Sequence, residues 1–143
     1  MSNLDDLKLS NQLCFPIYAL AKEMINQYRP FLDDLDLTYP QYLVMLVLWE
    51  NDHLTVGQIG DKLGLDSGTL TPLLKRLEQK GVVTRIRCST DERIVRISLT
   101  EKGSHLKMNA CKVPLQMKDK FDLTDEELLT FKRIIHKILH SKI

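Results

Sequence analysis

Two short capped segments that follow each other directly constrain the fold of this 143-residue chain most strongly. Thr55 and Gln58 stand three residues apart, as in a capping box that starts a helix, and Gly64 supplies a helix stop. Asp66 is a preferred N-cap residue for a second helix, which Gly81 ends. Two short helices joined by a tight turn are typical of a helix-turn-helix motif, and the sequence predicts one here.

The second helix of this pair has an apolar side and a polar side. Its leucines recur at helical spacing and form the apolar side: Leu70, Leu73, Leu74 and Leu77. Its other side carries short hydroxyl side chains and then basic ones: Ser67, Thr69, Thr71, Lys75 and Arg76. Such groups can contact phosphates or base edges in the major groove of DNA. A helix face that is merely exposed to water has the same composition. Whether this face binds DNA therefore depends on where the other cations lie.

A hairpin is predicted directly after the pair of helices. Residues 82–87 and 94–99 have strand-like composition, and turn-forming residues stand between them. A hairpin in this place is the wing of a winged helix. Its basic residues are Arg85, Arg87, Arg93 and Arg96. Any single cation here would be read as surface charge, but a cluster on helix and wing favours binding to double-stranded DNA.

Charge is segregated along the chain, although the net charge is only +1. Residues 31–61 carry six acidic and no basic side chains, whereas residues 62–96 carry eight basic and four acidic ones. The total excludes a strongly basic, histone-like protein but leaves room for a local DNA-binding surface. A winged helix of this size reads few base pairs alone, so we expect a two-fold homodimer on a palindromic operator.

A buried helix is predicted before this motif. Thr38 and Gln41 form a second capping box, and Pro40 falls in the first turn, where no hydrogen bond is lost. The helix runs to about Glu50 and is hydrophobic almost all round, which indicates burial.

The two ends of the chain also have helical patterns. The first helix has an apolar stripe, and Pro16 within it should delay the start of the helix or bend it; the stripe consists of Leu13, Ile17, Leu20, Ala21, Met24 and Tyr28. Thr100 caps a long helix that contains Pro114, and Thr124 with Glu127 starts the last helix.

These elements predict a mainly α fold with a small β wing in one domain, residues 1–143. Within it, residues 37–100 form the winged helix-turn-helix region that binds DNA. Residues 1–36 and 101–143 supply dimerisation helices, and the alternative for these segments is packing within one chain.

Several other classes of protein are excluded. The longest apolar run, residues 42–49, is too short to cross a membrane, and the acidic N-terminus is not a signal peptide. Three cysteines without CxxC spacing predict neither a disulfide framework nor a metal site. We therefore expect a cytoplasmic protein with free, reduced thiols.

The chain resembles the MarR family of transcriptional regulators. Within this family it is similar to the organic hydroperoxide resistance repressor (OhrR) subgroup and to SarZ-type regulators. The wing motif Asp91-Glu92-Arg93 is typical of the whole family, and three runs are typical of the subgroup: Asn11–Phe15 (NQLCF), Leu37–Leu43 (LTYPQYL, continuing to Leu48-Trp49-Glu50) and Leu65–Pro72 (LDSGTLTP). The similarity extends to about residue 105, and the last helices match in pattern only.

This resemblance implies a homodimeric repressor with a peroxide-reactive cysteine, Cys14. It also implies a regulator that is not an enzyme and that has no cofactor. It implies that Tyr28 and Tyr39 donate hydrogen bonds to the thiolate, one or both from the partner subunit. Tyr18 lines the same pocket, and with Phe15 the pocket favours organic hydroperoxides over hydrogen peroxide. The chemistry agrees, because the thiolate is the reactive form and both a helix N-terminus and hydroxyl donors favour it. Without the resemblance, Cys14 would be read as a small apolar residue.

Oxidation of Cys14 would give a sulfenic acid, which condenses with a second thiol. The second cysteine that some relatives carry near the start of the last helix is missing, and Pro16 departs from the expected helix-forming residue. We therefore favour a one-cysteine sensor that is capped by a low-molecular-weight thiol. Cys111 remains a candidate resolving thiol through a bridge between subunits, although an inert role is favoured for both Cys111 and Cys88.

Three alternatives stay open at this point. One is a regulator of the same fold that is released by reversible binding of a small phenolic ligand. Another is a broader redox or virulence regulator that acts at many promoters. The third is a thiol peroxidase that uses Cys14, which the lack of a nearby arginine in the sequence disfavours.

Overall fold

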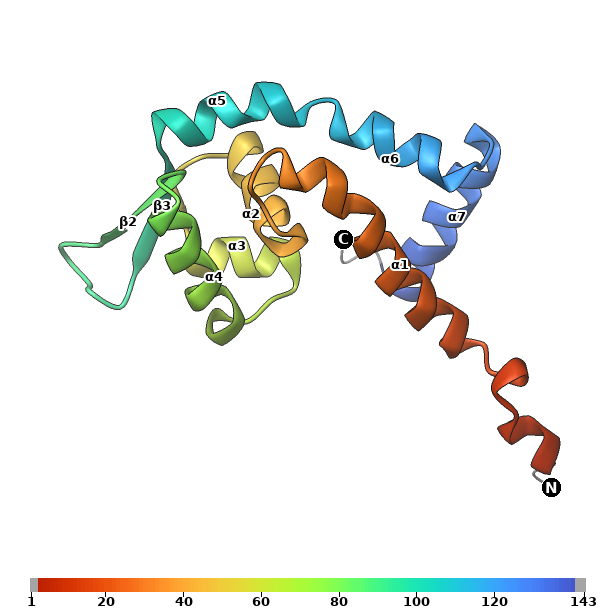
Figure 1. The fold of residues 1–143 in the computed structure, drawn as a ribbon. Helices are drawn as coiled ribbons and strands as arrows, with labels where there is room; N and C mark the ends of the chain where they lie inside the picture. The colour runs from red at the N-terminus through yellow and green to blue at the C-terminus, as the bar shows by residue number, and fades with distance from the viewer. Residues whose placement is uncertain (1–2, 141–143) are drawn as a thin grey trace.

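The computed structural model describes residues 3–140 and is mainly helical, with one small sheet (Figure 1). The ends of the expected terminal segments, residues 1–2 and 141–143, lie outside the described residues. The elements in chain order are the 3-10 helices η1 (Leu4–Leu7) and η2 (Leu9–Asn11), α1 (Cys14–Asp33), α2 (Tyr39–Glu50), β1 (Leu54–Thr55), α3 (Val56–Leu63), α4 (Ser67–Gln79), β2 (Val83–Arg87), β3 (Val95–Leu99), α5 (Glu101–Ala110), α6 (Val113–Phe121) and α7 (Asp125–Ile138).

The core lies where α2, α3, α4 and the sheet meet. Side chains from all four are almost fully buried there: Val44, Met45, Leu48, Ile59, Leu70, Leu74, Leu77 and Ile97. The predicted burial of α2 is confirmed, and so is the apolar side of α4, on which Leu73 is half-buried. This packing holds α4 with its polar side outward.

The helix starts predicted from the sequence are confirmed. Each of the three capping boxes has both of its hydrogen bonds, with the first residue as N-cap: Thr38, Thr55 and Thr124. Asp66 caps α4. Gly64 and Gly81 follow the ends of α3 and α4 with φ angles of 67° and 78°, in the left-handed region that glycine adopts without strain.

The predicted hairpin is present, and the sheet contains one strand more than expected. Its order is β1-β3-β2, with both neighbouring pairs antiparallel. The two residues of β1 pair with β3, Leu54 opposite the buried Ile97. We define the wing as β2, β3 and the connection between them.

The expectation of one long helix through Pro114 is wrong. The chain forms α5 and α6 instead, and Pro114 is the second residue of α6. Proline has no N–H to donate to the carbonyl of Ala110, and its ring would collide with that carbonyl in a continuous helix. The helix therefore ends at Ala110 and restarts at Val113. Pro114 then lies in a first turn, where no hydrogen bond is lost.

Pro16 has a smaller effect than expected. Helix α1 begins at Cys14, so Pro16 is its third residue and lies in the first turn. The start of the helix is not delayed. A second proline, Pro30, lies inside α1 near its C-terminal end.

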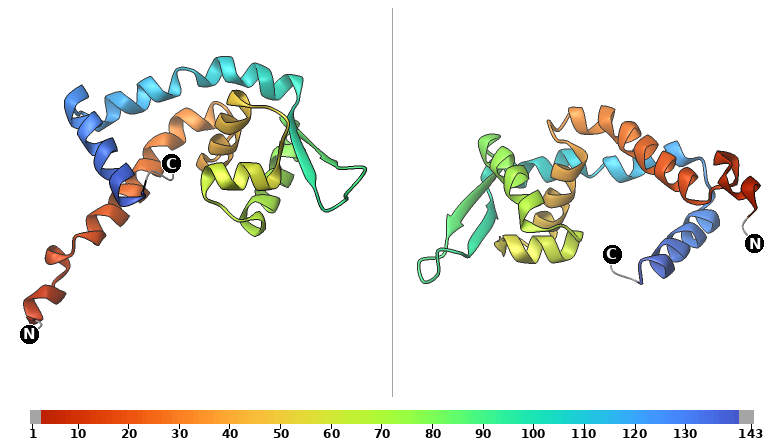
Figure 2. Two further views of the ribbon diagram at one scale, coloured as in Figure 1. Left: turned by 180° about the vertical axis from the view of Figure 1, so that it is seen from behind. Right: turned by 90° about the horizontal axis from the view of Figure 1, so that it is seen from below.

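The N-terminal half of α1 extends away from the core, and α7 turns back from the end of α6 (Figures 1 and 2). Both helices carry large apolar side chains that are exposed in the single chain: Leu13, Phe15, Ile17, Tyr18 and Leu20 on or beside α1, and Leu129, Phe131, Ile134, Ile135 and Ile138 on α7. The apolar stripe predicted for the first helix is thus present but largely uncovered. None of the described helices is long and apolar enough to cross a membrane.

Candidate functional site

The N-terminal turn of α4 presents its hydroxyl side chains outward. Ser67 and Thr69 are exposed, and the hydroxyl of Thr71 donates to the carbonyl of Ser67 at 2.7 Å. The carboxylate of Asp66 accepts the backbone N–H of Thr69 at 2.7 Å. Hydrogen bonds from the Thr69 backbone and side chain hold the pKa of Asp66 below its usual value. Asp66 therefore stays ionised and fixes the start of α4.

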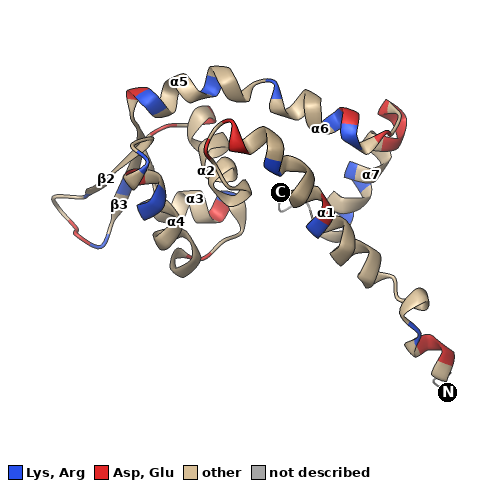
Figure 3. Cartoon of the chain, viewed as in Figure 1, with Lys and Arg blue, Asp and Glu red and all other residues tan. Residues whose placement is uncertain are grey.

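Cations continue from α4 onto the wing, as Figure 3 shows. Lys75 and Arg76 are exposed on α4. On the wing, Nη1 of Arg87 donates to the carbonyl of Glu92 at 3.0 Å, which ties the side chain to the turn.

Arg93 is held by the aspartate two residues before it. Its Nε and Nη2 donate to the two carboxylate oxygens of Asp91 at 3.1 and 3.2 Å, and its backbone N–H donates to the same group. These bonds lower the pKa of Asp91. The side chain of Arg93 is still 90% exposed. The two residues of the wing motif are thus in contact, and the cation of Arg93 is oriented and accessible.

Arg85 differs from the other predicted cations. Its side chain is only 25% exposed, and its Nε donates to a carboxylate oxygen of Glu78 at 3.2 Å. Sequence reasoning missed Glu78 because no local motif links the end of α4 to the middle of β2.

Three tyrosines form a cluster between α1 and α2. The ring centroids of Tyr28 and Tyr39 are 4.8 Å apart, and Tyr42 lies 5.9 and 6.3 Å from them. Burial and the neighbouring phenols raise the pKa of Tyr28 to about 12, and burial also raises the pKa of Tyr39 and Tyr42. Tyr28 and Tyr39 thus lie against each other with neutral phenols, and the cluster includes Tyr42, which sequence reasoning missed.

Cys14 lies far from these tyrosines within one chain. It is exposed at the first position of α1, fourteen residues before Tyr28. A rise of 1.5 Å per residue separates them by roughly 21 Å along the helix. Its neighbours Phe15 and Tyr18 are exposed, and the ammonium of Lys22 lies 5.3 Å from the ring centroid of Tyr18. One chain alone therefore does not assemble the predicted pocket.

The other two cysteines have different surroundings. The Sγ of Cys88 lies 3.1 Å from the hydroxyl of Thr90 in the wing, and this hydrogen bond lowers the pKa of Cys88. Cys111 follows the end of α5, and its Sγ donates to the carbonyl of Met108 at 3.0 Å.

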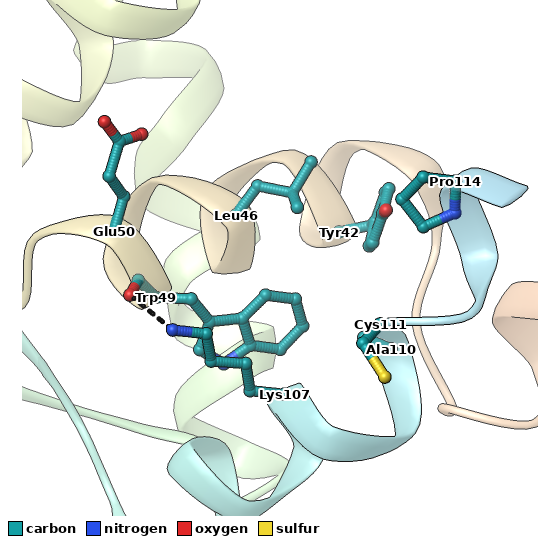
Figure 4. A pocket seen from close by; sticks show the side chains of 8 residues that line it. All are labelled: Tyr42, Leu46, Trp49, Glu50, Lys107, Ala110, Cys111 and Pro114. Carbon is teal, nitrogen blue, oxygen red and sulfur yellow. Dashed lines mark hydrogen bonds between the residues drawn. The ribbon is translucent and has the colours of Figure 1, made fainter.

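Cys111 also lines a cavity of about 350 Å³ between α2 and the junction of α5 with α6 (Figure 4). Tyr42, Leu46 and Trp49 form its apolar side. The ammonium of Lys107 donates to the carbonyl of Trp49 at 3.2 Å at one end. Within residues 3–140 no group of His, Cys, Asp or Glu is arranged to hold a metal ion.

A helix-turn-helix followed by a hairpin, with exposed cations on α4 and on the wing, defines a winged-helix protein. Residues 26–110, more than half of the chain, match the family model described as transcriptional regulator SarA/Rot. The chain belongs to this family of transcriptional regulators.

Individual relatives agree with this assignment. The chain is 49% identical over 140 residues to the organic hydroperoxide resistance transcriptional regulator of Bacillus subtilis strain 168, covering 98% of this chain and 95% of that protein. Reduced AbfR of Staphylococcus epidermidis bound to DNA superposes with a TM-score of 0.76 at 36% identity, covering 96% of each chain.

A second structure, a mutant MarR of Escherichia coli complexed with operator DNA, superposes with a TM-score of 0.82 at 26% identity. The match covers 96% of this chain and 99% of that one. The resemblance to the MarR family and to the organic hydroperoxide regulators is thus confirmed. The chain is a transcription regulator and not an enzyme, so the thiol peroxidase alternative is set aside.

Proposed function

We propose that this protein is a DNA-binding repressor that senses organic hydroperoxides by oxidation of Cys14 and then releases its operator. The observation that carries the proposal is a cysteine at the first position of α1, beside Phe15 and Tyr18, in a chain with near-complete coverage of an organic hydroperoxide regulator. We place the protein in the cytoplasm, where thiols are kept reduced.

The DNA contacts in this proposal come from α4 and the wing. The hydroxyl groups of Ser67, Thr69 and Thr71 meet base edges or phosphates at the N-terminus of α4. Cations supply affinity that does not depend on sequence: Lys75, Arg76, Arg85, Arg87 and Arg93, with Asp91 as the group that orients Arg93. We propose that residues 37–100 form the DNA-binding region.

A second copy of the chain completes the molecule. The exposed apolar side chains of α1 and α7 support a dimer interface built from residues 1–36 and 101–143, because surfaces of this kind are normally covered in a stable protein. A two-fold dimer presents two copies of α4, which suits a palindromic operator.

The dimer can also bring together the residues of the sensor pocket. Since Cys14 and the tyrosine cluster lie about 21 Å apart in one chain, we propose that Tyr28 and Tyr39 of one protomer face Cys14 of the other. Both phenols are protonated at neutral pH, since their pKa values lie above the ordinary tyrosine value of 10.0. Each can therefore donate a hydrogen bond to the Cys14 thiolate.

The oxidation itself is a nucleophilic displacement. The thiolate of Cys14 attacks the terminal oxygen of ROOH, the O–O bond breaks and the alcohol ROH leaves after protonation. The product, a sulfenic acid, condenses with a low-molecular-weight thiol and releases water to give a mixed disulfide. In the alternative, Cys111 of the partner subunit is the second thiol.

The cavity between α2 and the α5–α6 junction favours a second candidate function. A volume of about 350 Å³ beside Tyr42 and Trp49 suits a small phenolic molecule. In that case a reversible ligand releases the operator and leaves all three thiols unchanged.

Intact-mass spectrometry after substoichiometric cumene hydroperoxide, with and without a small thiol, tests the proposal. We expect a mixed-disulfide adduct that peptide mapping places on Cys14. A disulfide between Cys14 and Cys111 would instead establish the two-cysteine route. Unmodified Cys14 together with oxidation elsewhere would refute sensing by Cys14. Occupancy of promoters across the genome then separates a dedicated repressor from a broader redox or virulence regulator.

A further inference from the structure

Glu78 joins α4 to the wing through two different hydrogen bonds. One carboxylate oxygen accepts the backbone N–H of Arg85 at 3.2 Å, and the other accepts Nε of the same residue at 3.2 Å. Glu78 lies in the last turn of α4 and Arg85 in the middle of β2. A single side chain thus ties together the two elements that carry the exposed cations.

The hydrogen bond from the Arg85 backbone to Glu78 satisfies an N–H group that has no partner within the sheet. Strand β2 is an edge strand, because the order is β1-β3-β2. An edge strand has N–H groups that point away from its neighbour and lack a partner within the sheet. Glu78 supplies the acceptor for the N–H of Arg85, which lies opposite the fully buried Ile97. The contact therefore joins the middle of β2 to the last turn of α4.

The turn between the two residues makes this contact possible. The chain leaves α4 through Gly81, whose φ of 78° reverses its direction, and Val82 is buried immediately after it. The two charged side chains are 39% and 25% exposed, so the pair is partly shielded from water. Shielded pairs are screened less by salt than pairs at the surface.

We propose that Glu78 is a positioning residue for DNA recognition, which holds the wing at a fixed angle to α4. This inference rests on the proposed DNA binding. Glu78 has the wrong charge to contact DNA, and charge alone predicts that neutralising it would strengthen binding. The proposed role predicts the opposite for a specific site, where α4 and the wing have to engage the duplex together.

The test compares Glu78→Gln with wild type on two duplexes at fixed salt. One duplex is recovered by the wild-type protein from a random-sequence pool, and the other is an unselected sequence of equal length. Glu92→Gln is the matched control, since Glu92 lies in the wing and its side chain has no hydrogen bond or ion pair among residues 3–140. Circular dichroism and stoichiometric titration with DNA establish the folded, binding-competent fraction of each variant.

Glu78→Gln should bind the selected duplex about five- to tenfold more weakly, within the range of coupled contacts, and the unselected duplex as tightly as wild type or slightly more. Glu92→Gln should bind both at least as tightly as wild type. Tighter binding of Glu78→Gln to both duplexes would show that Glu78 is an ordinary acidic charge. Equal weakening on both would show a general structural defect, and either result overturns the inference. Recovery of no duplex by wild type would overturn the DNA-binding proposal itself.

Discussion

At the scale of single residues, the surface that we propose for DNA contains cations of different kinds. Arg93 is oriented by Asp91 and almost fully exposed, whereas Arg85 is half-buried against Glu78. An exposed and oriented guanidinium loses little side-chain freedom when it meets a phosphate or a narrow groove. Arg93 should therefore contribute more to DNA binding than Arg85.

Arg93→Ala should weaken binding to all DNA sequences and reduce the slope of log affinity against log salt concentration by about one. Fluorescence anisotropy across a salt series measures both. Lys120→Ala removes an exposed cation from α6 and serves as control, with an unchanged slope. An unchanged slope in Arg93→Ala as well would exclude a phosphate contact by this residue.

Gly103 occupies a position where no side chain fits. It is buried, and a Cβ there would collide with the backbone carbonyl of Val82. Gly103→Ala should lower the free energy of unfolding by about 1–3 kcal/mol, as overpacking does, in urea titration. Gly57→Ala is the control, because a Cβ at this helical position meets its nearest atom at 3.9 Å. Equal stability of both variants would contradict the close packing.

At the scale of elements, local sequence patterns were sufficient to predict where helices start. They were insufficient to predict contacts between elements. The Thr38, Thr55 and Thr124 boxes act over three residues, so their patterns in the sequence identify them. The break before Pro114 also has a local cause, although the sequence analysis placed one long helix through this proline. The sequence did not reveal β1, because a two-residue strand depends on its pairing with β3.

The candidate site shows the same division. Asp91 and Arg93 are two residues apart in the wing motif, and the structure shows that the guanidinium of Arg93 binds the carboxylate of Asp91. Tyr42 joins Tyr28 and Tyr39 only because α1 packs on α2, and Glu78 meets Arg85 only through the turn at Gly81. Contacts of this kind depend on packing between elements, which no local pattern contains.

The start of α4 should be sensitive to pH. The folded pKa of Asp66 is depressed below 3.8, so its stabilising contribution is present above that value and is lost as the pH falls through the folded pKa. Asn is also a good N-cap residue but does not titrate in this range. Below about pH 4, wild type should therefore lose more stability than Asp66→Asn in thermal melts followed by circular dichroism. Parallel loss in both proteins would contradict the role of the ionised cap.

At the scale of the whole molecule, two features of a single chain lack the groups that they would normally contact. Its apolar side chains on α1 and α7 are uncovered, and Cys14 is separated from the phenols that we propose as its hydrogen-bond donors. A second copy would satisfy both requirements at once. We therefore expect dimer formation and peroxide sensing to be coupled.

Ile17→Asp should shift the protein from dimer to monomer, because it places a charge in the proposed interface. Light scattering coupled to size exclusion measures the mass directly. The control is Ile86→Asp, which changes another exposed isoleucine, on the wing and outside the proposed interface. A dimeric Ile17→Asp protein would place the interface elsewhere.

Operator affinity, measured before and after addition of cumene hydroperoxide and a small thiol, tests whether Cys14 is the sensor. Wild type, Cys88→Ser and Cys111→Ser should all lose affinity, whereas Cys14→Ser should remain bound. Equal loss of affinity in wild type and Cys14→Ser would contradict the claim that Cys14 is the sensor.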